Sequence, residues 1–168
     1  MSKLEIKKYG DNVLRKNNVP VENITDEIKK LAADMLETMY SAPGVGLAAP
    51  QVGISLRICV IDVSPEKNSP VVMINPKITE RGDKILAEEG CLSFPGIYEK
   101  IGRFETVGAE YIDLNGKKSK IKAEGFLAKA IQHEIDHLDS KLFIDYLPDW
   151  KRKSVEKEIK RKKKAGDW

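Results

Sequence analysis

The sequence predicts a single α+β domain in which antiparallel β-sheets wrap around a central helix, with one further helix near each end. The middle of the chain, residues 56–123, is rich in β-branched residues, which are typical of strands. After Gly125, apolar residues recur at helical spacing on two opposite faces, which indicates a helix buried in the core. A length of 168 residues is enough to bury one such core.

The first helix is predicted to begin at residues 24–27, where Thr25 can cap the helix ahead of an acidic first turn. Its apolar positions form one stripe, made of Ile28, Leu31, Ala32, Met35, Leu36 and Met39. The helix should end near Ser41, because a Pro-Gly pair follows at residues 43–44. Residues 44–51 are small, apolar and glycine-rich, and they fit neither a helix nor a regular strand.

Three segments of the β region have the composition of strands, namely residues 58–61, 71–74 and 106–112. Asn115-Gly116 stands between residues 110–114 and 118–123. That pair is a strong signal for a two-residue hairpin turn, so we expect the two segments to pair.

Two helices are predicted in the last third of the chain. The central one carries Phe126, Ala130, His133 and His137 on one face and Leu127, Ile131, Ile135 and Leu138 on the other. The last helix covers about residues 150–164, after Pro148-Asp149, and its thin apolar face consists of Trp150, Val155 and Ile159. We therefore expect residues 1–148 to form the main unit and residues 149–168 to form a basic helix of the same domain.

Composition restricts the protein class. Hydrophobic residues make up 41% of the chain and charged residues 33%, as in soluble globular proteins. No apolar run approaches membrane-spanning length, and residues 1–8 lack the apolar core of a signal peptide, so we expect a cytoplasmic protein without a membrane partner. With two cysteines, Cys59 and Cys91, the chain does not predict a disulfide framework.

The net charge of +3 is unevenly distributed. Residues 151–168 hold nine basic and three acidic side chains, whereas the remaining 150 residues sum to −3. A basic tail on a mildly acidic body has two interpretations. It is a solvated helix that maintains solubility, or it binds an anionic partner.

The two histidines of the chain form the pattern H-E-x-x-H at His133-Glu134-Ile135-Asp136-His137. On a helix, positions i and i+4 lie one turn apart on one face, so two imidazoles there can bind one metal ion. Glu134 is then placed to take a proton from a metal-bound water. A metal would also satisfy polar groups that are otherwise costly to bury in a core helix.

The third ligand determines the chemistry, and the sequence offers two interpretations. Zinc endopeptidases of the thermolysin type take a glutamate downstream of the second histidine, and Glu156 and Glu158 lie at about that distance. Both belong to a strongly basic, weakly amphipathic helix that suits a solvated surface. Cys91 follows Gly90, which allows close backbone approach, and a thiolate is a good ligand for such a metal. Cys59 fits a core position in a strand.

Three segments together resemble the signature motifs of the peptide deformylase family. They are Gly44-Val45-Gly46-Leu47-Ala48-Ala49-Pro50-Gln51, Glu89-Gly90-Cys91-Leu92-Ser93 and Gln132-His133-Glu134-Ile135-Asp136-His137. The resemblance covers nearly the whole chain. It implies a metallohydrolase that removes the formyl group from the N-terminal formyl-methionine of newly synthesised polypeptides and releases formate.

The resemblance also implies roles for individual residues. Cys91, His133 and His137 match the metal ligands, with water as the fourth. Glu134 matches the general base and acid. The implied metal is one Fe²⁺ per chain, which Zn²⁺, Ni²⁺ or Co²⁺ can replace. The side-chain amide of Gln51 and the backbone N–H of Leu92 match the donors that stabilise the negative charge on the formyl oxygen.

Substrate contacts follow from the same match. The nascent peptide would be added as a strand between Val45-Gly46 and Gly90. The residues that match the methionine pocket are Val45, Ala87, Phe126, Lys129, Ala130 and His133. Glu89 and Arg103 match a supporting ion pair.

The sequence departs from the family pattern at three places. Lys129 replaces a residue that is commonly apolar, so its stem would line the pocket while its ammonium group reaches water. Pro43 stands where an acidic residue is common. Asp139-Ser140 replaces an Asn-Gly turn.

The expected partners are the nascent formyl-methionyl polypeptide and, through the basic tail, the ribosome near its exit tunnel; no DNA partner is expected. Two alternatives remain at this point. One is a zinc endopeptidase with Glu156 or Glu158 as third ligand. The other is a non-catalytic ribosome-binding module with a structural metal, which would need a fourth protein ligand that the sequence does not supply.

Overall fold

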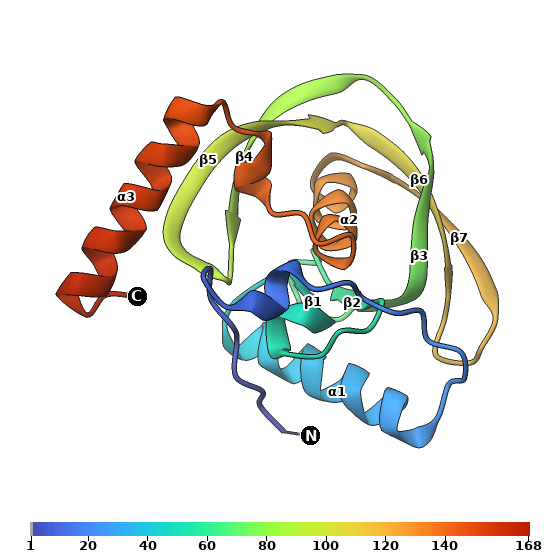
Figure 1. Ribbon diagram of the computed structural model, residues 1–168. Coiled ribbons are helices and arrows are strands. Elements are labelled where there is room, and N and C mark those ends of the chain that lie inside the picture. The colour runs from blue at the N-terminus through green and yellow to red at the C-terminus, as the bar shows by residue number, and fades with distance from the viewer. Residues whose placement is uncertain (1) are drawn as a thin grey trace.

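A computed structural model describes residues 2–168 of the chain (Figure 1). Its helices and strands are, in order, α1 (Asp26–Ser41), β1 (Gly46–Ala48), β2 (Ile58–Ile61), β3 (Val71–Arg81), β4 (Lys84–Cys91), β5 (Phe94–Phe104), β6 (Thr106–Ile112), β7 (Lys118–Glu124), α2 (Gly125–Leu138) and α3 (Asp149–Ala165). Short 3-10 helices occur at Asn12–Arg15, Ala49–Val52 and Phe143–Tyr146.

Two antiparallel sheets surround α2, as predicted. The larger sheet has the strand order β1-β2-β3-β6-β7, and the smaller sheet is the β4-β5 hairpin. Figure 1 shows both sheets curving around α2, which is seen nearly end-on in the middle of the molecule. Nine of the fourteen residues of α2 are buried, because apolar side chains on two faces meet a sheet on each side. The α+β architecture is therefore confirmed.

Helix α1 begins and ends as its sequence predicts. The Oγ1 atom of Thr25 accepts the N–H of Ile28, and two acidic residues occupy the first turn, where they complement the helix dipole. On its inner face, Ala32, Met35 and Met39 are completely buried. This face of α1 packs against β1 and β2. The 3-10 helix Ala49–Val52, which contributes to the site, follows β1 directly.

The structure corrects two predictions in the β region. The glycine-rich stretch contains a short strand, β1, because Gly46–Ala48 pairs with Cys59–Ile61 of β2. The turn at Asn115-Gly116 is longer than the predicted two residues, since the last pair of the hairpin is Ile112 with Lys118. The loop is held by Asp113 Oδ1, which accepts the N–H groups of residues 115 and 117.

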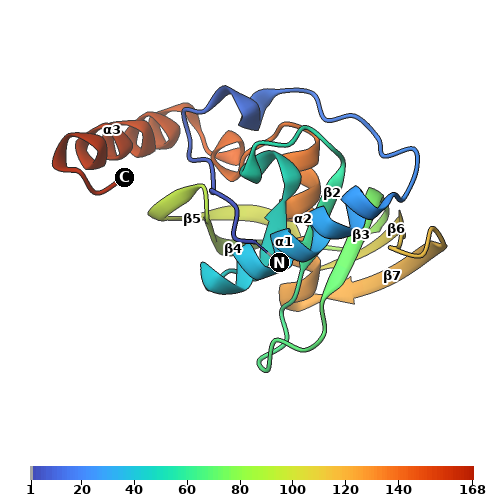
Figure 2. The ribbon, with the colours of Figure 1, turned by 90° about the horizontal axis from the view of Figure 1, so that it is seen from below.

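Helix α3 lies beside β5 at the edge of the molecule, and the two views agree on this (Figures 1 and 2). Val155 and Ile159 are buried in a cluster that includes Phe94 and Phe143. Trp150 does not join them, because it lies on the opposite face of the helix and is 71% exposed. The prediction that Trp150 shares one apolar face with Val155 and Ile159 is therefore wrong. Within residues 2–168, none of the helices is long and apolar enough to cross a membrane.

Candidate active site

A cleft of about 790 Å³ opens between α2, the β4-β5 hairpin and residues 42–46. Its lining includes all six residues that the sequence predicts to bind substrate: Val45, Gly46, Gly90, Phe126, Lys129 and Ala130. Ala87 and His133 also line it, as predicted for the pocket. Phe126 is 58% exposed, which places it at the rim of the cleft.

Three side chains of types that can bind a metal, Cys91, His133 and His137, meet at this cleft, and the first two line it. Cys91 ends β4, where the register of the hairpin shifts between Gly90 and Cys91. Such a bulge redirects a side chain. His133 and His137 lie one turn apart on α2. The Nε2 atom of His137 is 3.4 Å from Cys91 Sγ and 3.2 Å from His133 Nε2. The three donor atoms lie within 4.8 Å of one another.

These donors fit a metal ion. His133 Nδ1 lies 2.6 Å from Glu89 Oε1, and this hydrogen bond leaves the lone pair of Nε2 directed at the other two donors. Sulfur and imidazole nitrogen form a ligand set that suits borderline divalent metals. Three protein donors converge within the described residues, which is one fewer than a closed structural site of four protein ligands would have.

The two imidazoles differ in their proton affinity. Burial would lower the pKa of His133, but its interactions with Cys91 and its hydrogen bond to Glu89 raise it well above its usual value. Burial and the neighbouring His133 cation lower the pKa of His137.

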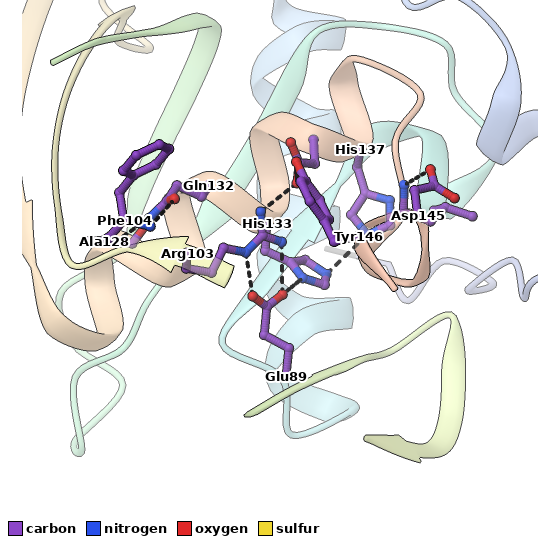
Figure 3. A network of polar contacts seen from close by, with 11 residues as sticks. Glu89, Arg103, Phe104, Ala128, Gln132, His133, His137, Asp145 and Tyr146 are labelled. Carbon is purple, nitrogen blue, oxygen red and sulfur yellow. Dashed lines mark hydrogen bonds and ion pairs between the residues drawn. The ribbon is translucent and has the colours of Figure 1, made fainter. Parts of the chain in front are cut away.

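Glu89 is the hydrogen-bond partner of His133 on the Nδ1 side of its ring (Figure 3). Its carboxylate accepts hydrogen bonds from Nε and Nη2 of Arg103 as well as from His133. Burial would raise the pKa of Glu89, but the hydrogen bonds from Arg103 and His133 lower it to about 2. Glu89 therefore stays ionised, and the predicted pairing of Glu89 with Arg103 is present in the structure.

Glu134 follows the first histidine and is 4% exposed. Its Oε2 atom is buried and has no hydrogen-bond partner among residues 2–168. Burial raises the pKa of Glu134 to about 7, against the opposing effect of a protonated His133. A carboxyl group with such a pKa can both accept and return a proton near neutral pH. Gly46 packs directly against it, and a Cβ atom at that position would collide with Oε1.

Gln51 reaches the same centre from the 3-10 helix after β1. Its Nε2 donates to Ser93 Oγ at 3.1 Å and lies 3.5 Å from Cys91 Sγ, while its Oε1 accepts the N–H of Ala48. These bonds hold the amide N–H₂ beside Cys91 Sγ. The N–H of Leu92, beside Cys91, makes no hydrogen bond to any of the residues that the structure describes.

The glutamates of the endopeptidase alternative point elsewhere. Glu156 accepts the Tyr9 hydroxyl, and Glu158 pairs with Arg161 on the surface of α3. Neither belongs to the cluster of donors, so the idea that one of them is the third ligand is wrong. Cys59 is completely buried in the core, as predicted.

Sequence reasoning missed three residues of the site. Ser93 is fully buried and fixes the amide of Gln51. Asp136 and Tyr146 bind Arg103 from the side opposite Glu89. Burial and the Asp136 carboxylate raise the pKa of Tyr146 to about 12, so its hydroxyl remains a donor. Asp136 occupies a variable position of H-E-x-x-H, and Tyr146 comes from a different segment, so no sequence pattern marked either one.

The three departures from the family pattern lie in the cleft and directly after α2. Lys129 and Pro43 line the cleft. Ser140 has φ of 62°, a left-handed conformation that favours glycine or asparagine. Its hydroxyl donates to the carbonyl of Lys16, which provides a local bond in that conformation.

Comparison with known proteins gives a consistent result. The family model described as polypeptide deformylase matches residues 3–153. A protein of Endomicrobium trichonymphae named peptide deformylase is 70% identical over 168 residues and covers 100% of both chains. A crystal structure of a peptide deformylase from Legionella pneumophila superposes with a TM-score of 0.94 at 42% identity and covers 98% of each chain. One from Ehrlichia chaffeensis in complex with actinonin has a TM-score of 0.91 at 41% identity, with 96% of this chain and 98% of that chain covered.

Proposed function

Because this chain belongs to the polypeptide deformylase family, we propose that Cys91, His133, His137, Glu134, Gln51 and Leu92 carry out its deformylation reaction. The chain is a metal-dependent hydrolase that removes the formyl group from N-terminal formyl-methionine of newly synthesised polypeptides. The observation that supports the residue roles is the convergence of three ligand atoms beside the unpaired carboxyl group of Glu134.

The metal would be held by Cys91, His133 and His137. When bound, it supplies Lewis acidity, which lowers the pKa of water at the site and polarises the formyl oxygen. A ligand set of one thiolate and two imidazoles is compatible with Fe²⁺, Zn²⁺, Ni²⁺ or Co²⁺. We propose Fe²⁺ as the metal in the cell, as in similar enzymes. Metal analysis of protein purified without oxygen tests this, and a stoichiometric content of another metal would reject it.

Glu134 would move the proton. Its carboxyl group takes a proton from the attacking water and delivers it to the amine that leaves when the formyl C–N bond breaks. The pKa of about 7 suits both steps, because the group is neither a strong acid nor permanently protonated at neutral pH. The absence of a Cβ atom at Gly46 lets the carboxylate lie directly beside the strand that would receive the substrate.

Gln51 and Leu92 would stabilise the negative charge that develops on the formyl oxygen. The amide of Gln51 is held in place before substrate arrives by Ala48 and Ser93, so it needs no reorganisation during the reaction. An amide donates hydrogen bonds without titrating. The free N–H of Leu92 lies next to Cys91 in the turn between β4 and β5.

The substrate backbone would lie between Val45-Gly46 on one side and Gly90 on the other, as an added strand. This position directs the methionine side chain into the part of the cleft between Ala130 and Phe126. Lys129 is a partly exposed residue of the same wall, so its methylene groups would contact the substrate while its ammonium group stays in water.

The direct test is formate release from formyl-Met-Ala-Ser by purified, metal-loaded protein. We expect turnover by the natural chain and a loss of about 10³-fold for Glu134→Ala, with the metal retained. Formate release by Glu134→Ala at the natural rate would reject its role as general base. Release of formate by neither protein, with metal bound in both, would count against the whole assignment.

We further propose that residues 149–168 belong to the same domain and bind the ribosome near the exit tunnel, and that the protein works in the cytoplasm. The burial of Val155 and Ile159 supports the first point. A stripe of exposed lysines, formed by Lys153, Lys157, Lys160 and Lys164, lies on the opposite face of α3 and supports the second. Such a stripe complements the phosphates of ribosomal RNA.

A further inference from the structure

A chain of polar contacts connects the surface of the molecule to the imidazole of His133 (Figure 3). Tyr146 donates its hydroxyl to Asp136 Oδ2 at 2.8 Å, and Arg103 Nη1 donates to the same oxygen at 2.6 Å. From its other side, Arg103 donates twice to Glu89, which accepts the Nδ1 proton of His133 at 2.6 Å.

Arg103 is the central member of this chain. It is 3% exposed, and its planar group makes a two-bond fork with Glu89 and a third bond with Asp136. The ring of Tyr146 covers the guanidinium, with 5.0 Å between the ring centre and Cζ. Tyr146 therefore contacts Arg103 in two ways, through its ring and through Asp136. Because the guanidinium is rigid, a constraint on one edge fixes the direction of the other.

Asp136 is held in turn from two sides. Its Oδ2 atom is shared by Arg103 and Tyr146, which lie on β5 and on the 3-10 helix Phe143–Tyr146. Asp136 itself lies on α2, one residue before His137. Three separate segments thus meet at one carboxylate oxygen of the helix that carries the histidines.

We propose that Tyr146 and Asp136 are positioning residues that hold Arg103, and through it Glu89 and the imidazole of His133, in the orientation that binds the metal. This inference rests on the proposed role of His133 as a ligand. Partners of ligating histidines act by fixing the tautomer and ring direction, and removal of such a partner typically weakens metal binding by 10- to 100-fold. Tyr146 lies further out in the chain, so its hydroxyl should contribute about three- to tenfold.

Tyr146→Phe is the informative variant, because it removes only the hydroxyl and keeps the ring over Arg103. We expect its affinity for Zn²⁺, measured by competition with a fluorescent chelator, to fall by about three- to tenfold. Asp136→Ala should weaken Zn²⁺ binding by about tenfold or more. In the Asp136→Ala background, Tyr146→Phe should have no further effect, because the hydroxyl has lost its acceptor.

Tyr40→Phe provides a matched control. Tyr40 also donates its hydroxyl to a carboxylate, Asp62, at 2.6 Å, but it lies on α1 and does not line the cleft. We expect Tyr40→Phe to lower the melting temperature of the metal-free protein and to leave Zn²⁺ affinity unchanged. Excess Zn²⁺ should restore kcat of Tyr146→Phe with KM unchanged, since the cleft lining is intact.

Each outcome decides the proposal. Unchanged Zn²⁺ affinity in Tyr146→Phe, with only a lower melting temperature, would assign this residue a purely structural role and overturn the inference. If Tyr146→Phe lowered the Zn²⁺ affinity equally in the natural chain and in Asp136→Ala, the proposal that Tyr146 acts through Asp136 would be overturned. A natural chain that binds no Zn²⁺ would instead reject the ligand assignment itself, so the two failures are distinguishable.

Discussion

Gly46 lies so close to Glu134 that a single added methyl group would occupy the space of the carboxylate oxygen. Gly46 belongs to β1, whereas Glu134 lies on α2, so this contact sets the distance between the helix and the strand that would receive the substrate. The φ angle of Gly46 is not in the left-handed region, so the glycine is required by space and not by backbone conformation.

Gly46→Ala should therefore impair catalysis more than folding. We expect a loss of about 100-fold in kcat/KM, because the methyl group would displace the carboxylate from its working position by about 1 Å. Gly102→Ala is the matched control, since a Cβ atom there meets only the flexible side chain of Lys84. Equal kcat/KM values for Gly46→Ala and the natural chain would show that the close packing has no catalytic consequence.

Glu89→Gln should destabilise the protein even without metal. The substitution leaves the buried guanidinium of Arg103 with Asp136 as its remaining charged partner. Breaking a buried ion pair typically costs about 3 kcal/mol, which urea unfolding of the metal-free protein would measure. Glu110→Gln, which removes an exposed pair with Lys120, should change stability by less than about 0.5 kcal/mol. A similar loss of unfolding free energy in both variants would contradict the claim that the buried pair contributes more to stability than the exposed one.

Cys91→Ser and Glu156→Gln should behave differently in metal binding. Cys91 supplies one of the three converging donors, whereas Glu156 bonds to Tyr9 on the surface. We expect Cys91→Ser to lose bound metal during dialysis and Glu156→Gln to keep a full equivalent, as measured by elemental analysis. Metal loss in Glu156→Gln but not in Cys91→Ser would instead support a site with Glu156 as the third ligand, as in zinc endopeptidases.

Charge reversal on the exposed face of α3 should weaken ribosome binding while leaving the enzyme intact. Lys157→Glu combined with Lys160→Glu changes only exposed positions, so folding and formate release should be unaffected. Co-sedimentation with ribosomes should weaken by about tenfold and show a shallower dependence on salt. Lys117→Glu with Lys118→Glu, at the exposed hairpin loop, is the control. Equal co-sedimentation of both double variants would reject docking through α3.

Asp62 should make stability depend on pH in the acid range. Burial would raise its pKa, but hydrogen bonds from Ser64, Tyr40 and Ser69 lower it below the ordinary value of 3.8. Because the pKa is lower in the folded state, this stabilisation is complete above pH 4 and is lost as the pH falls through about 4 and below. The difference in melting temperature between the natural chain and Asp62→Asn should therefore shrink below about pH 4. A constant difference down to pH 3 would contradict this assignment.

Elements with a local physical cause could be predicted from the sequence. Helix α1 has its own cap at Thr25 and a continuous apolar stripe, and α2 has apolar residues on two faces. Strand β1 has no such signal, because its three residues become a strand only by pairing with β2. Trp150 was assigned to the wrong face of α3, since so few apolar residues do not define which side of a helix is buried.

In the site, too, residues placed by local sequence could be predicted, whereas residues placed by tertiary contacts could not. His133, Glu134 and His137 share one helix, so their spacing predicts their geometry. Cys91 was one of two candidate third ligands on chemical grounds, and only the resemblance to a known motif favoured it, because its position depends on how the β4-β5 hairpin packs against α2. Asp136 and Tyr146 could not be found in this way. Their contact with Arg103 joins three segments, and it exists only in the folded chain.

The proposed ligands lie on two elements that are distant in the sequence, with Cys91 on the small sheet and both histidines on α2. An unfolded or partly docked chain does not hold them together, so metal binding and the docking of the hairpin are thermodynamically linked. A substitution that merely loosens the hairpin, for example at buried Ile97 or Ile101, would present as a defect in metal retention with every ligand intact. In a mutational screen of this enzyme, rescue by added metal would therefore mark both the ligands and the residues that pack the hairpin in place, and would not by itself tell them apart.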